Sequence, residues 1–265
     1  MSHDAEGVVR MSQPAERLKQ ASAFEVKLAV RAEEIEQALR LRYKVFVEEA
    51  GNLRLLNESK LETDEYDAYC DHLIVTDLET EQVIGTYRLL PGDRAVRNKG
   101  FYSETEFDLS GFREYKLQTL ELGRSCIAPE YRGSKAIQLL WEGIAGYITE
   151  HGHQYLIGCA SVHMKNLQEL NALYSMLRSK GVITDRFGIQ PLPAHRIKDL
   201  EFTPVEADDK EVFRRLPPLM KGYQWLGAEI GGEPAYDPIF DTTDFLIVLD
   251  TAKVTRRYRR HFLGR

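Results

Sequence analysis

Residues 117–162, LQTLELGRSCIAPEYRGSKAIQLLWEGIAGYITEHGHQYLIGCASV, contain the pattern that decides the fold. Alternating apolar residues predict a strand over residues 117–128, and a PEYRG turn follows it. The next apolar residues recur at helical spacing, which predicts a helix that ends near Gly152. Residues 155–162 are almost uniformly apolar, which is typical of a strand buried on both faces in a parallel pair.

The same periodicities, followed outward, predict the rest of the chain. Strands are expected at residues 24–30, 72–77, 82–90 and 244–250, and further helices at residues 33–50 and 166–180. Together they predict an α/β (α+β) fold: a mixed, mostly antiparallel sheet with a central parallel strand pair, flanked by helices. Residues 1–24 are polar and aperiodic, so we interpret them as a mobile arm before a single domain at residues 25–265.

Length and composition exclude several classes of protein. With 265 residues, 43% of them hydrophobic, the chain can bury a substantial core and is not disordered as a whole. Apolar runs fall short of the roughly 18–20 residues that a bilayer crossing needs, and the polar N-terminus argues against a secretory signal. Three widely spaced cysteines fit a reducing compartment, so we expect a cytoplasmic location.

Charge is distributed unevenly along the chain. The net charge is −6, yet residues 253–265, KVTRRYRRHFLGR, carry +6, which leaves −12 on the remainder. Overall acidity argues against a dedicated nucleic-acid binder. A basic end on an acidic body predicts an anionic partner such as a membrane surface or an acidic carrier protein. The alternative is a solvated terminal helix.

The turn between the central strand and its helix is a candidate phosphate site. Free N–H groups at a helix N-terminus favour anions, and Arg132 and Lys135 add positive charge there. An ordinary strand–helix turn is the alternative. This strand–turn–helix–strand unit resembles the acyl-thioester site of the GCN5-related N-acetyltransferase (GNAT) superfamily, whose loop reads Arg/Gln-x-x-Gly-x-Gly/Ala.

In this chain the loop residues are Arg132, Gly133, Ser134 and Lys135, and Lys135 stands where the central glycine of the superfamily belongs. A lysine crowds the close approach that the pyrophosphate of coenzyme A needs. The resemblance therefore implies the single phosphate of a phosphopantetheine arm on acyl carrier protein, and no permanently bound cofactor.

Further fragments resemble the acyl-homoserine-lactone synthases, which are GNAT-like enzymes that take acyl chains from acyl carrier protein. RYKVF, DEYD, GTYRLLP and ELGR occur here in the order and spacing of that family. The positions that match its charged residues and aromatic residue are predicted to bind substrate: Arg42, Phe46, Asp64, Asp67, Arg88 and Arg124, with Glu121 beside them.

A sister group, the ornithine N-alpha-acyltransferases of ornithine-lipid synthesis, resembles the chain from about residue 25 to its end. ELGRSCIAPEYRG and the late stretch PPLMKGYQWLGAEIGGEPAYDPIFDTTDFLIVLD carry this resemblance. It implies transfer of a (3-hydroxy)acyl chain from acyl carrier protein to the α-amine of L-ornithine, giving a lyso-ornithine lipid. It also implies a cytoplasmic enzyme that docks on the inner face of an anionic membrane.

Attack of an amine on a thioester needs a base, a holder for the oxyanion and a proton for the departing sulfur. Glu121 is the candidate base, with an ion pair to Arg124 as the alternative. The superfamily places the oxyanion at backbone N–H groups from Ser125 to Ile127. Tyr174 is the candidate donor to sulfur, and a core position is its alternative.

An amino-acid substrate needs partners for its charged groups. Arg42, Arg88 and Arg124 are candidates for its carboxylate. A side-chain ammonium is expected to meet Asp64, Asp67 or Asp244. The alternative is an ion network that orders the N-terminal half. No metal site is expected, because the histidines lack partners at ligand spacing.

Three other functions are carried as alternatives: acylation of another amino acid such as glycine or lysine, an acyl-homoserine-lactone-type synthase, and a non-catalytic module that docks on carrier protein or membrane. The late LMKGYQWLGA segment counts against the lactone synthase. The intact strand–turn–helix unit with Glu121 counts against the docking module.

Overall fold

The structure is a computed structural model that describes residues 23–254 except 165, 207, 209–213, 215 and 217. Almost all of the predicted N-terminal arm, residues 1–24, lies outside the described residues. The same is true of the basic end beyond residue 254. The interpretations of both ends therefore stay predictions.

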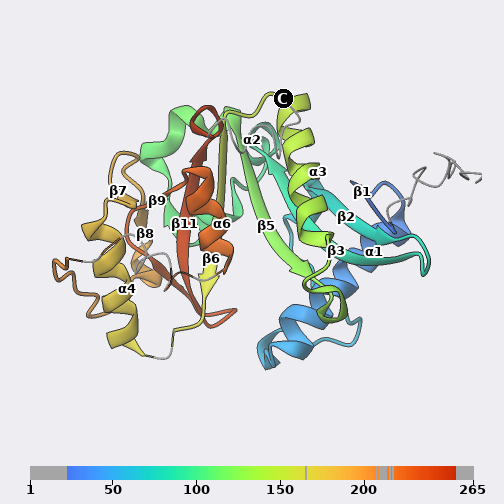
Figure 1. The fold of residues 1–265 in the computed structure, drawn as a ribbon, viewed down its shortest axis with the longest axis horizontal. Helices are drawn as coiled ribbons and strands as arrows, with labels where there is room; N and C mark the ends of the chain where they lie inside the picture. The colour runs from blue at the N-terminus through green and yellow to red at the C-terminus, as the bar shows by residue number, and fades with distance from the viewer. Residues whose placement is uncertain are drawn as a thin grey trace, which may run out of the picture.

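The described residues form one large mixed sheet (Figure 1). Its order is β1 (Phe24–Leu28), β2 (Asp71–Asp77), β3 (Gln82–Pro91), β5 (Thr119–Ile127), β6 (Tyr155–Val162), β11 (Thr242–Asp250), β9 (Glu229–Gly231) and β7 (Ile183–Thr184), with β10 (Ala235–Asp237) beside β11. A separate pair joins β4 (Phe107–Asp108) to β8 (Gln190–Pro191). The pairs β5–β6 and β7–β9 are parallel and the other described pairs are antiparallel, which confirms the predicted fold class.

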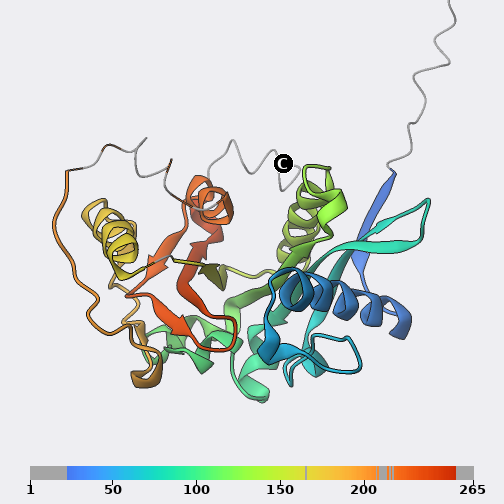
Figure 2. The same cartoon turned by 90° about the horizontal axis from the view of Figure 1, so that it is seen from below.

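Helices cover both faces of this sheet (Figure 2). α3 (Ala136–His151), α4 (Leu167–Ser179) and α6 (Pro218–Leu226) lie on one face. α1 (Ala32–Tyr43), which continues as a π-helical turn to Glu49, lies on the other, together with α2 (Gly92–Arg97). α6 begins at Pro218, because proline lacks only an N–H that the first turn of a helix does not use.

Strand alternation divides the core between the two faces. On β11, Phe245, Ile247 and Leu249 pack into the cluster beneath α3, α4 and α6. Leu246 and Val248 point the opposite way, into a second cluster with the segment that follows β3. A strand buried on both faces reads as an unbroken apolar run, so β11 and β6 were recognisable in the sequence.

β5 and β6 pair over only three residues each and then separate. Their parallel register runs from Thr119–Tyr155 to Glu121–Ile157. Beyond it, β6 remains paired with β11 and β5 with β3. At the point of separation a Cβ on Gly158 would meet the Leu122 carbonyl oxygen at 2.3 Å, so only glycine lets β6 pass there. The separation leaves the edge of β5 beyond Glu121 without a neighbouring strand on that side, within the described part of the chain.

Candidate active site

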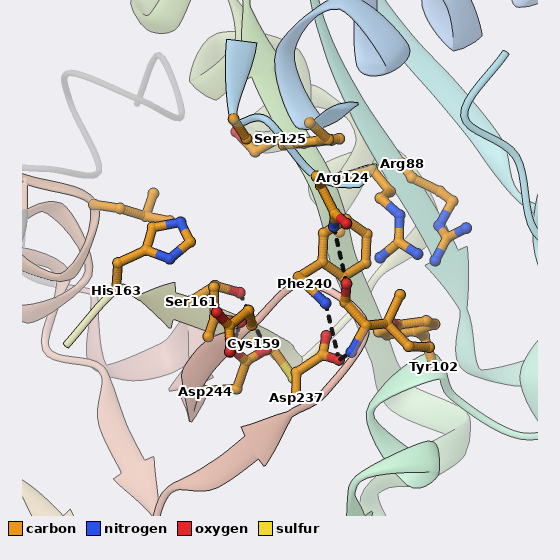
Figure 3. Close-up of a pocket in the computed structure, with 18 of the residues that line it drawn as sticks. Arg88, Tyr102, Arg124, Ser125, Cys159, Ser161, His163, Asp237, Phe240 and Asp244 are labelled. Carbon is orange, nitrogen blue, oxygen red and sulfur yellow. Dashed lines mark hydrogen bonds between the residues drawn. The ribbon is translucent and has the colours of Figure 1, made fainter. Parts of the chain in front are cut away.

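A cleft of about 640 Å³ opens where β5 and β6 separate (Figure 3). The two strands and the loops at residues 50–54 and 237–242 enclose it. Most of the charged and polar side chains at the cleft come from segments far apart in the sequence. The charged and polar side chains that line the cleft include Arg54, Arg88, Tyr102, Glu121, Arg124, Ser125, Cys159, Ser161, His163, Asp237, Asp241 and Asp244.

Arg88 and Arg124 on the wall of the cleft belong to a network of three arginines and three acids that extends behind this wall. We refer to it as the outer network, and its members are Arg42, Arg88, Arg124, Glu62, Asp64 and Asp67. Arg42 donates to Glu62 and, through Nη1, to Asp67 Oδ1 at 2.6 Å. Arg88 Nη1 donates to Asp64 Oδ1 at 2.6 Å and to Asp67 Oδ1 at 3.2 Å. Arg124 donates to Glu62 Oε1 at 3.0 Å and to Asp64 Oδ2 at 2.9 Å.

The outer network is buried and balanced in charge. Burial by itself raises the pKa of Asp67, but hydrogen bonds and charge from Arg42 and Arg88 outweigh it and hold this pKa well below its usual range. The ion network offered as an alternative for Arg42, Asp64, Asp67 and Arg88 is therefore present. Sequence reasoning missed Glu62, because it lies in an aperiodic charged loop that offered no signal.

The arginines of the outer network differ in how many N–H donors they can present to a ligand in the cleft. Arg42 is fully buried and does not line the cleft. Arg124 lines it, but two of its nitrogens are held by Glu62 and Asp64 and its guanidinium lies 4.5 Å from the centre of the Tyr102 ring. Arg88 also lines the cleft, and its hydrogen bonds to described residues all run through Nη1. Its Nε and Nη2 are thus the donors best placed for a ligand.

Arg124 reaches this position through a β-bulge. Its φ of 51° is left-handed, and the register with β3 shifts between Thr86 and Arg88. Residues three apart on a regular strand point to opposite faces, so a pair between Arg124 and Glu121 needs such a bulge. The bulge is present, but it turns Arg124 toward Glu62 and Asp64, so the predicted alternative of a Glu121–Arg124 ion pair is wrong.

Glu121 lies at the bottom of the cleft, where β5 leaves β6. Oε2 accepts from the Tyr102 backbone N–H at 2.7 Å. Oε1 accepts from the Ser103 backbone N–H at 2.8 Å and from the Ser103 hydroxyl. Burial raises the pKa of Glu121, although the Ser103 and Tyr102 hydrogen bonds oppose this. A carboxylate offers about four acceptor positions, so three bonds leave one on Oε2 for a proton.

The loops at the mouth of the cleft are joined across it. Asn52 Nδ2 donates to the Ile239 carbonyl at 2.9 Å, and Arg54 donates to the Pro238 carbonyl. The Phe46 ring, predicted to contact substrate, lines the cleft and packs edge-on against Phe240 with centroids 6.0 Å apart. The N-terminal and C-terminal halves of the domain therefore meet at this rim.

The predicted thioester-site residues separate into two groups. Ser125 lines the cleft, as the oxyanion prediction requires, whereas Ile127 packs partly buried against the core. Arg132, Gly133, Ser134 and Lys135 do not line the cleft but form the turn before α3. In that turn Gly133 has a φ of 87°, and Arg132 makes a two-pronged ion pair with Glu49 at 2.5 and 2.6 Å.

Tyr174 does not reach the cleft. It is 3% exposed on α4, packs in the core and lies edge-on to Phe202. The structure therefore gives a role as proton donor to sulfur no geometric support and matches the core alternative. Cys126 is likewise a buried core residue.

Comparison with known proteins identifies the family of the chain. A family profile described as "Acetyltransferase (GNAT) domain" matches residues 41–142. The chain is 37% identical to L-ornithine N(alpha)-acyltransferase of Brucella abortus, over 92% of this chain and 90% of that protein. It is 39% identical to the protein of the same name from Rhizobium meliloti, over 90% and 84%. The chain belongs to the L-ornithine N(alpha)-acyltransferase family.

Membership of this family makes the chain an acyltransferase of the GNAT superfamily and confirms the resemblance identified from its motifs. The fold agrees with that of the AHL synthase LasI, with a TM-score of 0.50 at 15% identity over 91% of this chain and 95% of LasI. No helix among the described residues is both long and apolar enough to cross a bilayer.

Proposed function

We propose that the chain transfers a (3-hydroxy)acyl group from acyl carrier protein to the α-amine of L-ornithine, forming a lyso-ornithine lipid. The observation that carries the proposal is the cleft at the separation of β5 and β6, with Arg88, Glu121 and Ser125 on its walls. The names of the relatives support ornithine as the acceptor.

The amine enters with its carboxylate on Arg88. Nε and Nη2 of Arg88 make a planar fork that suits a carboxylate, and the acids on Nη1 hold the guanidinium in place. Arg124 adds positive charge nearby. Glu121 takes the proton of the α-amine on Oε2, and its raised pKa makes it a stronger base than an ordinary glutamate.

The thioester lies along the unpaired edge of β5. Attack by the amine turns the thioester carbonyl into an oxyanion, and backbone N–H groups near Ser125 hold it there. A positioned donor of this kind lowers the barrier by about 3–4 kcal/mol. Collapse of this intermediate forms the amide and releases the pantetheine thiolate.

A phosphopantetheine arm is the donor favoured by the turn before α3. Gly133 takes up the left-handed conformation that brings backbone N–H groups near an anion, while Lys135 fills the place of a second glycine. One phosphate needs less room than the pyrophosphate of coenzyme A. The basic end beyond Lys253 supplies charge for an acidic carrier protein or an anionic membrane.

Purified protein tests the proposal when it is incubated with 3-hydroxyacyl and acyl carrier protein thioesters and a panel of amino acids. Mass spectrometry is expected to detect N-acyl ornithine without S-adenosylmethionine. A product from glycine or lysine in its place favours the other N-acyl amino acid synthases. Absence of product from every pair, including acyl coenzyme A donors, favours the non-catalytic docking module and overturns the proposal.

A further inference from the structure

A second group of acids lies at the β6 and β11 side of the cleft, where Asp244 lines it and the buried Glu106 lies directly behind. Glu106, Cys159 and Asp244 place one ligand atom each within 4.8 Å of one another. Cys159 is on β6, Asp244 is opposite Ser161 on β11, and Glu106 follows the 3₁₀ turn at Tyr102–Thr105. Cys159 and Asp244 line the cleft (Figure 3). We call Glu106 and Asp244 the inner acidic site.

Glu106 is an exceptional acid in this protein. It is 2% exposed, and neither carboxylate oxygen has a hydrogen-bond partner. Among the acidic side chains that the structure describes, it is the only buried one with both oxygens unpaired. A buried carboxylate without a partner costs free energy, and a ligand that donates hydrogen bonds to it would offset this cost.

Its acidic neighbours are better satisfied. Asp244 accepts from the Thr242 hydroxyl at 2.7 Å and the Ser161 hydroxyl at 3.1 Å. Asp237 accepts from the Ile239 N–H at 2.6 Å and the Phe240 N–H at 3.3 Å. All of these partners are uncharged, and no described lysine or arginine forms an ion pair with Glu106, Asp237 or Asp244. The inner acidic site therefore has a surplus of negative charge that the balanced outer network lacks.

Burial and this surplus of negative charge raise the pKa of both acids. Burial, followed by the charges of Asp244 and Asp237, raises the pKa of Glu106 to about 9. Burial raises the pKa of Asp244 to about 6. The empty site consequently retains a proton at neutral pH, which an entering cation displaces.

The third group of this cluster indicates which cation fits. The Cys159 thiol donates to the Ser103 hydroxyl oxygen at 3.8 Å, and burial raises its pKa well above its usual value, so it lies beside the two acids as a neutral hydrogen-bonded thiol. An alkylammonium carries three N–H donors and is suited to two carboxylates beside a neutral thiol. We propose that Glu106 and Asp244 bind the side-chain ammonium of the amino-acid substrate and so select a cationic side chain.

This proposal rests on the acyl transfer to an amino acid proposed above. An amino acid whose side chain lacks charge leaves Glu106 unpaired in the complex, and a site built for a polar group discriminates strongly against an analogue without it. Norvaline is the matched analogue, because it has the three side-chain carbons of ornithine and lacks the amine.

The experiment compares ornithine and norvaline as acceptors for the wild type, Glu106→Gln and Asp244→Asn. The ratio of kcat/KM for the two amines is expected to fall by about 10-fold or more in both variants, because a charged hydrogen bond is lost. Asp250→Asn is the control, since Asp250 is on the same strand and outside the cleft, and its ratio is expected to match the wild type.

A structural role for Glu106 gives a different result. Equal losses with both amines, or a lower melting temperature of Glu106→Gln with an unaltered ratio, overturn the proposal. Tight binding of Zn²⁺ or Mg²⁺ that Glu106→Gln abolishes overturns it in favour of a metal site. Acylation restricted to amines without a side-chain cation overturns it and leaves acyl transfer standing.

Failure of the proposed function itself is distinguishable. If the wild type acylates no amine, calorimetry of ornithine and norvaline binding to the same proteins tests whether the inner acidic site binds the side-chain ammonium. Binding of ornithine above norvaline that both variants lose supports the inner acidic site. Equal binding of the two amines, or binding of neither, overturns it.

Discussion

Glu121 on β5 pairs in parallel register with Ile157 on β6, and this is the last pair that the two strands form in the described chain. The carboxylate of Glu121 therefore lies where the sheet separates into two halves. The cleft begins at this point, with the outer network on one side and the inner acidic site on the other. A proton acceptor, a carboxylate-binding arginine and a second acidic site consequently surround one opening.

Removal of Arg42 is expected to destabilise the whole domain. Arg42→Met leaves Glu62, Asp64 and Asp67 facing only Arg88 and Arg124, so one buried negative charge is uncompensated, which typically costs about 3–5 kcal/mol. Urea unfolding followed by circular dichroism measures this loss. The control is Arg40→Met, because Arg40 makes an exposed pair with Glu36 that contributes only about 0.3–0.5 kcal/mol. Equal midpoints for the two variants would contradict the stabilising role of the outer network.

Arg88→Lys is expected to raise the KM for the amine by about 10-fold or more, because lysine cannot form the planar fork on a carboxylate. The KM for the acyl donor is expected to change little. Steady-state kinetics with each substrate varied in turn separates the two effects. Arg94→Lys serves as the control, since Arg94 pairs with Asp71 outside the cleft. A rise in the donor KM alone would remove Arg88 from the amine site.

Glu121→Gln is expected to lower kcat by about 10²–10⁴-fold, the usual contribution of a positioned general base. The base must be ionised, so wild-type kcat/KM is expected to rise with pH through the raised pKa of Glu121. The variant should lose the rise of kcat/KM with pH that is due to Glu121, while the other acidic groups of the cleft are unchanged. An identical pH profile at lower rate would instead indicate that Glu121 only orders the Tyr102–Thr105 turn.

Arg132→Ala is expected to raise the apparent KM for acyl carrier protein thioesters by more than the KM for the amine. Arg132 now pairs with Glu49, and a donor phosphate would compete for the same guanidinium. Lys135→Ala should act in the same direction. Arg97→Ala is the control, because Arg97 makes an exposed pair with Asp93 on another helix. An unchanged donor KM in both loop variants would place the phosphate elsewhere.

The stability of the empty enzyme is expected to fall as pH rises from about 5 to 9. Acids whose pKa is raised on folding stabilise the protein while protonated, and this contribution is lost as pH rises through the folded-state pKa. For Asp244 and Glu106 these values are about 6 and about 9. Glu106→Gln removes the upper part of this loss, so its melting temperature should exceed that of the wild type most clearly near pH 9. Differential scanning calorimetry across this pH range measures the melting temperatures of both proteins. A difference between wild type and variant that stays constant with pH would argue against a buried, unpaired Glu106.

Much of the fold was predictable because buried elements leave periodic traces. The strands β2, β3, β5, β6 and β11 and the helices α1, α3 and α4 appeared near their observed positions. Residues 93–116 read as irregular, and the structure finds α2 and several 3₁₀ turns there. Short elements of this kind are stabilised by contacts with the sheet, and they leave too few residues to establish a period.

The candidate site was only partly predictable. Motif order identified Arg88, Glu121, Arg124 and Ser125, which all line the cleft. Glu106 was missed, because nothing in the local sequence TEFDLS separates it from an ordinary surface glutamate. Its importance comes from burial beside Asp244, which is 138 residues away along the chain.

The sequence by itself determined the fold class, the family and the identity of the charged motifs, since hydrophobic period and short-range order are properties of the chain. Tertiary structure alone decided which charges find partners. The sequence does not distinguish the roles of Arg42, Arg88 and Arg124. In the folded protein Arg42 is fully buried, Arg88 donates to its acidic partners through Nη1 alone, and a β-bulge directs Arg124 toward Glu62 and Asp64. Pairing depends on distances between segments that meet only after folding, and the same dependence leaves Glu106 without a partner.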